Sequence, residues 1–177
     1  MGDSIWPVVV KLAEVDRKDQ LLRVTADEAV RARICKLLDL SSLDRFEATV
    51  RLTSWLDGAI VRGEWSADLA QTCGITLEPL PAVLSGVFEL KVLQKDSPNA
   101  PLDDPDAVID PEADDPPDLL ENDDVPVGDF LIEHLALELD PFPRKPGVVF
   151  EQPDPPGVIS PFAALKDFKP RSGDKDR

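Results

Sequence analysis

The alternation of apolar and polar residues between positions 46 and 73 constrains the fold of this chain more than any other feature. Apolar residues occupy alternate positions on both sides of the dipeptide Asp57-Gly58, which is typical of type I′ hairpin turns. They are Phe46, Ala48, Val50 and Leu52 before the dipeptide and Val61, Trp65, Ala67, Leu69 and Cys73 after it. This period of two predicts a long two-stranded ribbon with one buried face.

Three further segments are predicted to join the ribbon in a sheet. Residues 5–12 and the short run around Leu22 and Val24 predict two N-terminal strands, and residues 82–94 predict a strand that follows the ribbon. The predicted fold class is therefore α+β: an antiparallel sheet or open barrel of about five strands with two packed helices, a long acidic loop and a short C-terminal helix. We expect one α+β domain over residues 1–143 and a Pro-rich tail over residues 144–177.

Two segments are predicted to be the packed helices. The first begins with the capping-box pattern of residues 25–28, in which Thr25 is the N-cap, and ends near Leu40. Its buried stripe is predicted to consist of Val30, Ile34, Leu37 and Leu38. The second is predicted over Val127–Leu139, with an apolar face that includes Phe130, Leu131 and His134 and packs on the sheet.

One segment supplies the whole charge imbalance of the chain. There are 35 acidic and 19 basic side chains, and residues 96–143 hold sixteen of the acids with no Lys or Arg. The part at about 96–124 is also rich in proline, so we predict a disordered loop that cannot bury enough apolar surface to offset the entropy of ordering. Such a loop either keeps the protein soluble or binds a basic protein partner.

The candidate partner-binding residues come from this acidic loop and from the C-terminal tail. Ser160 as N-cap and Pro161 at the first helical position predict a short helix at about 161–169, whose apolar side chains dock either on the body or on a partner. The candidates are Asp103, Asp104, Asp106, Asp114, Asp115, Phe162, Leu165 and Phe168.

The sequence shows no pattern typical of a catalytic or metal site. It contains no phosphate-binding loop, nucleophile elbow or calcium loop. The single histidine, His134, is interpreted as a packed side chain, and Cys35 and Cys73 as structural thiols in a reducing cytoplasm. We therefore expect no catalytic residue, metal, cofactor or small-molecule substrate. Without a signal peptide or a run of about 18 apolar residues, we also expect no membrane partner.

Four short motifs occur in order along the chain. They are Cys73-Gly74-Ile75-Thr76-Leu77-Glu78-Pro79, Glu133-His134-Leu135-Ala136-Leu137, Asp140-Pro141-Phe142-Pro143, and Pro161-Phe162-Ala163-Ala164-Leu165 with Lys169. Together with the acidic segment, this order resembles the bacterial YceD family of large ribosomal RNA subunit accumulation proteins, from about Thr25 to the last residue. Thr76 departs from the pattern, because many family members carry a second cysteine there, so C-x-x-C metal or redox chemistry is not open to this chain.

The resemblance implies a non-enzymatic, cytoplasmic ribosome biogenesis factor that supports 23S rRNA synthesis, processing or accumulation. The acidic charge favours a basic ribosomal protein or a large-subunit assembly intermediate as the partner. Direct RNA binding is not expected to dominate, because binding to phosphates depends on Lys and Arg. Two alternatives stay open: a metal-dependent RNA-processing enzyme that uses the acidic cluster, including Asp103 and Asp104, and an acidic adaptor protein without a ribosomal link.

Overall fold

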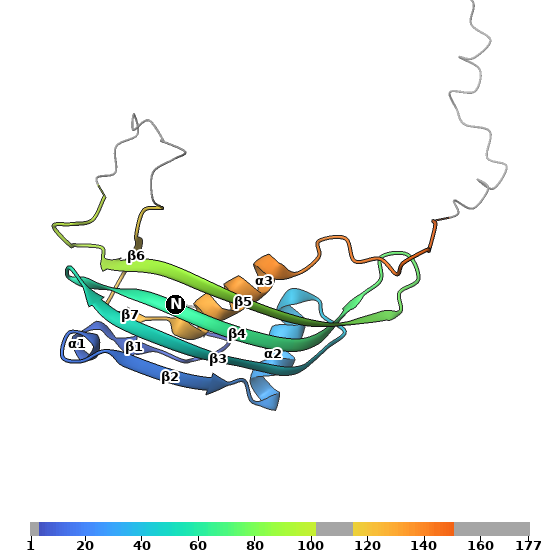
Figure 1. Ribbon diagram of the computed structural model, residues 1–177, viewed down its shortest axis with the longest axis horizontal. Coiled ribbons are helices and arrows are strands. Elements are labelled where there is room, and N and C mark those ends of the chain that lie inside the picture. Colours follow the sequence, from blue (N-terminus) through green and yellow to red (C-terminus); the bar gives the residue numbers. More distant parts are fainter. Residues whose placement is uncertain (1–3, 102–114, 151–177) are drawn as a thin grey trace, which may run out of the picture.

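The computed structural model of the chain describes residues 4–101 and 115–150 (Figure 1). Its strands are β1 (Val10–Lys11), β2 (Gln20–Thr25), β3 (Ser42–Trp55), β4 (Gly58–Thr72), β5 (Pro79–Gln94), β6 (Asp118–Leu120) and β7 (Asp124–Val125). Its helices are α1 (Leu12–Val15), α2 (Glu28–Leu38) and α3 (Val127–Glu138). The predicted helix at 161–169 lies outside the described residues, and no helix within them is long and apolar enough to cross a membrane.

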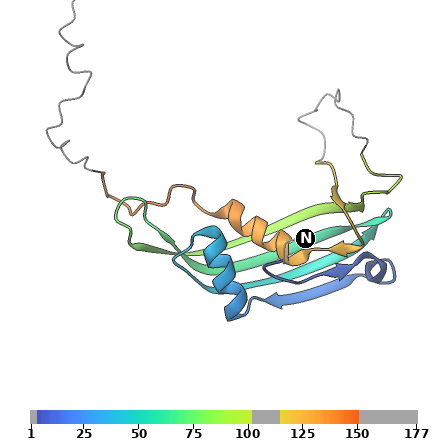
Figure 2. The same ribbon diagram turned by 180° about the vertical axis from the view of Figure 1, so that it is seen from behind.

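A five-stranded sheet in the order β2-β3-β4-β5-β6 forms the body, and β1 pairs with β7 in a separate two-stranded sheet. Strands β2 to β5 are antiparallel to their neighbours, whereas β6 runs parallel to β5. Seen from behind, α2 and α3 lie against one face of the sheet (Figure 2). The α+β class and a mostly antiparallel sheet of five strands are confirmed, but the fifth strand is the parallel β6 and not residues 5–12, which were predicted to join the sheet.

The core lies between this inner face and the helices. The alternation that predicted the ribbon is confirmed, because the predicted inner residues of β3 and β4 are all buried. Phe46 lies at the centre, with its ring 5.1 Å from Trp6 and 6.0 Å from Trp65. Burial of large apolar side chains on the two sides of this layer is the main source of stability.

The turn of the ribbon differs from the prediction. Trp55 pairs with Gly58, so the two turn residues are Leu56 and Asp57, and Leu56 takes a left-handed φ of 54°. Gly58 is the first residue of β4, where an added Cβ would lie 1.9 Å from the main-chain oxygen of Val92 in β5. This glycine therefore serves the close approach of two strands and not a type I′ turn.

The start of α2 also differs from the predicted capping box. Thr25 stays in β2 opposite Glu47, and Asp27 is the N-cap, with its carboxylate accepting a 2.8 Å hydrogen bond from the N–H of Val30. The helix ends at Leu38 rather than near Leu40, because Asp39 adopts the left-handed conformation at φ 52°. The predicted stripe is correct for Val30 and Ile34 and wrong for Leu37, which is 55% exposed. The last turn thus reaches past the edge of the core.

The N-terminal region and the acidic segment contain elements that the sequence analysis missed. The strand predicted at residues 5–12 is reduced to β1, and Leu12 starts the one-turn helix α1. The end of the loop predicted at 96–124 contains β6 and the start of β7, because Leu120 and Val125 are buried in the core. Residues 102–114 of that loop lie outside the described part of the chain.

Helix α3 occupies the predicted position and packs on the sheet through its predicted face. Val127, Leu131 and Leu135 are fully buried, and α3 contacts β4 and β5. The N-terminal segment closes over the start of this helix: the Gly128 N–H donates to the Val8 oxygen at 3.0 Å, and an added Cβ on Gly128 would lie 2.0 Å from the Trp6 oxygen. The helix is thus held against the β5 side of the sheet.

Candidate functional site

The free edge of β5 is the longest stretch of unpaired strand in the described structure. Strand β5 pairs with β4 along its length, but on its other side β6 covers only residues 92–94. The N–H of Lys95 donates to Leu120 of β6 at 2.9 Å, whereas the oxygen of Glu78 accepts from Cys73 at the end of β4. Because successive residues of a strand point their main-chain groups to opposite sides, odd-numbered residues of β5 face the free edge.

This alternation explains the two prolines that open the strand. Pro79 and Pro81 are odd-numbered, so their missing N–H groups fall on the side where no strand pairs with them. Val83, Ser85, Val87 and Glu89 follow on the same side, and within the described residues their edge-facing main-chain groups have no hydrogen-bond partner. We call residues 83–89 the free β5 edge. The side chains of Val83 and Val87 on its outer face are 73% and 80% exposed.

A groove of about 600 Å³ lies at the end of the free β5 edge, and we call it the acidic groove. Its lining comes from β5, from the residues that lead into β6, and from α3: Glu89, Leu90, Lys91, Asp115, Pro116, Asp118, Glu133 and His134. Glu89 is paired with Arg62 at 2.6 Å, whereas Asp115, Asp118 and Glu133 make no ion pair with any described residue. The lining contains one basic side chain, Lys91, so the acidic side chains outnumber it and give the groove a net negative charge.

His134 lies at the boundary between the groove and the core. Its half-buried ring stacks on Phe88 of β5, with 4.1 Å between the ring centroids and an interplanar angle of 13°. This contact confirms the prediction of a packed histidine. No three His, Cys, Asp or Glu side chains of the described residues converge closely enough to hold a metal ion. The acidic groove can therefore attract a cationic group, with α3 as its floor.

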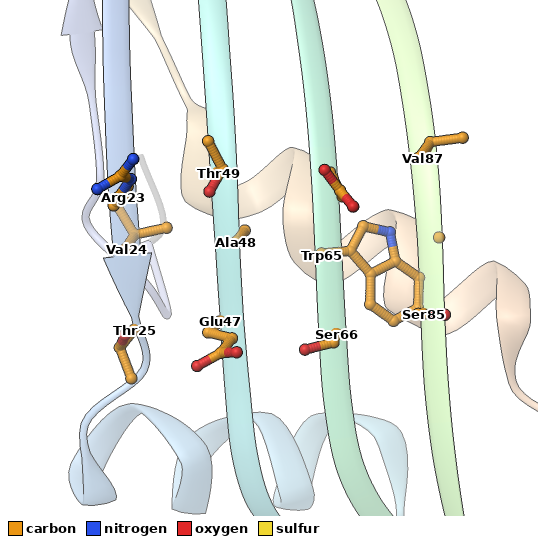
Figure 3. Close-up of a pocket in the computed structure, with 12 residues that line it drawn as sticks. Arg23, Val24, Thr25, Glu47, Ala48, Thr49, Trp65, Ser66, Ser85 and Val87 are labelled. Atoms are coloured by element: carbon orange, nitrogen blue, oxygen red, sulfur yellow. The ribbon is translucent and has the colours of Figure 1, made fainter.

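A second concave region lies on the outer face of the sheet (Figure 3). This hollow of about 750 Å³ crosses β2, β3, β4 and β5, and Figure 3 shows polar side chains of all four strands around it. The polar residues lining it are Arg23, Thr25, Glu47, Thr49, Glu64, Ser66 and Ser85. Its lining contains no histidine or cysteine, and Glu47 is paired with Arg45 at 2.5 Å. The lining of the hollow therefore consists mainly of groups that can form hydrogen bonds.

The turn between β4 and β5 holds the thiol of Cys73 among hydrogen-bond donors. The N–H groups of Thr76 and Lys145 each lie 3.4 Å from its sulfur. Hydrogen bonds from the Thr76 hydroxyl and main chain, and then from Lys145 and Ile75, lower the pKa of Cys73 to about 6. The Lys145 ammonium, 2.8 Å from Glu78, ties residue 145 to the same turn.

The structure confirms that the two cysteines are separate packed side chains. Cys35 is half-buried and Cys73 is buried, and both are free thiols. Burial raises the pKa of the Cys35 thiol, whereas hydrogen bonds lower that of Cys73. The N–H of Thr76 faces the sulfur of Cys73, at the position where the YceD-like pattern expects a second cysteine. Residue 73 thus has a structural role in the turn.

Of the eight partner-binding residues predicted from the sequence, the described structure contains one. Asp115 lies in the acidic groove, beside Asp118 and Glu133. The others, Asp103, Asp104, Asp106, Asp114, Phe162, Leu165 and Phe168, lie outside the described residues. The free β5 edge was missed, although Pro79 and Pro81 at alternate positions were a sequence signal for an edge strand.

Comparison with known proteins adds no relative to this description. No protein-family model matches the chain, and neither a curated protein nor a solved structure matches it.

Proposed function

We propose that this protein is a non-enzymatic, cytoplasmic binding protein that engages a basic protein partner through the acidic groove and the acidic segment around it. The observation that carries this proposal is that Asp115, Asp118 and Glu133, which pair with no described basic residue, line one groove at the end of the free β5 edge. The resemblance to the YceD family directs the proposal to a basic ribosomal protein or large-subunit assembly intermediate, and so to the accumulation of 23S rRNA.

Charge complementarity supports this kind of partner. The chain has a formal net charge of −16, and residues 96–143 carry acids without any Lys or Arg. An electrostatic surface of this kind speeds association with a cationic protein and discriminates against anionic ones. Exposed charges are screened within about 10 Å at moderate ionic strength, so the interaction is expected to weaken as salt rises.

A capture experiment with matched variants tests the binding step. The first variant reverses Asp115, Asp118 and Glu133 to lysine, and the control reverses three exposed acids elsewhere, Glu14, Asp19 and Asp44, for the same change in net charge. We expect the immobilised protein to retain large-subunit ribosomal proteins at low salt and to lose them when the groove is reversed. Equal capture by the groove variant and the control would refute a local role for the groove.

A cellular experiment tests the biological step. Ribosome profiles and 23S rRNA levels are measured in a deletion strain complemented with the natural chain, the groove variant or the control. The groove variant is expected to leave the large-subunit deficit of the deletion in place, whereas the control restores it. A normal profile in the deletion strain would favour an adaptor without a ribosomal link. Magnesium-dependent RNA cleavage by the pure protein, lost on substitution of Asp103 and Asp104, would favour the processing enzyme.

A further inference from the structure

We infer that the partner binds by strand addition: an extended segment rich in lysine or arginine pairs with the free β5 edge along residues 83–89, with its basic side chains in the acidic groove. This inference rests on the proposed function for the basic character of the partner and adds the mode of recognition. Strand addition is a common way for a sheet to bind an extended peptide, because main-chain hydrogen bonds give affinity and side-chain pockets give specificity.

The main chain of β5 provides the first part of the argument. Val83, Ser85, Val87 and Glu89 direct N–H and C=O groups away from β4, and no described residue pairs with them. Folded proteins usually protect such an edge with charged side chains, prolines, bulges or a covering element. Here the prolines protect only the first residues of β5, and β6 covers only its last three. Between them, about 20 Å of the strand is paired with no described residue on this side.

The side chains beside this edge provide the second part. On the outer face, an added strand would lie next to the exposed side chains of Val83 and Val87, which favour apolar neighbours. On the inner face, it would lie next to α3, where Glu133 and His134 line the acidic groove. Because side chains of a strand alternate between faces, the fitting segment alternates apolar and basic residues.

Charge decides between a basic partner and a second copy of this chain. If two β5 edges paired with each other, the acidic grooves of both copies would be brought to one interface, in molecules that each carry −16. Like charges across an interface oppose association, whereas a cationic segment gains attraction from the same groove. The occupant of the free β5 edge is therefore a basic segment of another protein.

Synthetic peptides test the pairing on the unmodified protein. The probe is an alternating lysine–valine peptide of about eight residues. Two derivatives carry N-methyl groups either on every lysine amide or on every valine amide, so that each loses the donors of one edge only. We expect titration calorimetry to show that one derivative binds about tenfold or more weakly while the other binds like the parent. Equal affinities of the two derivatives would overturn strand addition.

Variants of the protein test the same pairing from the other side. Val87→Pro removes an edge-facing N–H at a position equivalent to Pro79 and Pro81, and Val87→Ala keeps it. We expect the proline variant to bind the parent peptide about tenfold more weakly than the alanine variant. Leu21→Pro in β2, on the opposite edge of the sheet, is the second control and should leave peptide affinity unchanged. Should Val87→Pro fail to fold, the N-methyl derivatives decide.

The outcomes separate this inference from the proposed function. If reversal of Asp115, Asp118 and Glu133 abolishes capture of ribosomal proteins but neither N-methylation nor Val87→Pro changes peptide affinity, the groove binds by charge alone and strand addition is wrong. If groove reversal changes nothing, the proposed function itself fails. Slow hydrogen exchange at the Val83, Ser85 and Val87 amides without any peptide would show that the chain covers its own edge, and would also overturn the inference.

Discussion

The two edges of the five-stranded sheet differ in length, protection and charge. Strand β2 is six residues long, and its surroundings fix both ends: the side chain of Gln20 donates to the oxygens of Glu14 and Lys18, and Arg31 donates to the oxygen of Ala26 just beyond the strand. Strand β5 is sixteen residues long, and β6 covers only its end. Basic Arg23 lies on the outer face of β2, whereas carboxylates gather beside β5.

The same sheet thus has one short edge strand with polar and basic side chains and one long strand that β6 covers only at its end. A short edge strand with polar or basic side chains is a common protection against unwanted association. The long strand β5, with its exposed valines, lacks that protection, which agrees with the proposal that it pairs with a partner strand. Substitutions can show what supports the β5 edge and what distinguishes it from the β2 edge.

The largest effect is expected from removing the support beneath β5. Leu131 of α3 is fully buried, and Leu131→Ala should lower the free energy of unfolding by about 2–5 kcal/mol, because a cavity opens in the core. The matched control on the same helix is Leu137→Ala, whose side chain is 73% exposed and should cost less than about 0.5 kcal/mol. Urea unfolding measures both. Similar values for the two variants would show that α3 does not support the sheet as described.

The next effect concerns the contact between β4 and β5. Gly58→Ala places a methyl group 1.9 Å from the main-chain oxygen of Val92, so the strands must separate locally. We expect a loss of about 1–3 kcal/mol in unfolding free energy. Gly74→Ala is the control, because its nearest neighbour would lie at an ordinary 3.7 Å. If the two alanine variants are equally stable, the close approach at Gly58 has been assigned wrongly.

A smaller effect is expected beside the β2 edge. Asp27 caps α2 two residues after β2 ends, and Asp27→Ala should cost about 1 kcal/mol through the lost hydrogen bond to the Val30 N–H. Asp27→Ser keeps an acceptor and should recover most of this loss. Thermal unfolding measures the stability of both variants. Peptide affinity at the β5 edge is the second measurement and should not change; a change would mean that the two edges are coupled.

The last expected effect is a pH dependence at the turn that starts β5. Because hydrogen bonds hold the pKa of Cys73 at about 6, below that of an unfolded thiol, the folded chain binds fewer protons between the two values. Stability from the thiolate is therefore present above the unfolded pKa and is lost as pH falls through about 6. Urea unfolding of Cys73→Ala should show a free energy of unfolding that depends less on pH than that of the natural chain. Identical pH profiles would show that the Cys73 thiolate does not stabilise the folded chain. Cys35→Ala is the control.

The elements that the sequence predicted share a strong period. Phe46 to Leu52 and Val61 to Leu69 alternate over enough residues to mark two strands, and the apolar face of α3 repeats over three turns. Strand β6 has three residues, of which only Leu120 is buried, so no window of sequence distinguishes it from a loop. Its pairing with β5 depends on tertiary packing.

The candidate site was less predictable than the fold, for a related reason. The acidic groove brings together Asp115, Asp118 and Glu133 only once β6 and α3 have docked beside β5. Composition identified an acidic segment but not which acids meet. The turn of the ribbon was also predicted wrongly from local sequence. Asp57-Gly58 matches a turn dipeptide, but Gly58 is required by its contact with β5, a strand more than twenty residues further along the chain.

The pairing of β1 with β7 has a consequence for how the chain is made. Val10 is synthesised more than a hundred residues before its partner Val125, and Trp6 and Val8 are synthesised well before the helix that they hold in place. Contacts so distant in sequence form slowly, because a large loop must close, at a cost in chain entropy, before the contacts can form. During translation, the inner face of the sheet therefore stays without α3 until most of the chain is complete. An unfinished chain is expected to be the form of this protein most dependent on chaperones.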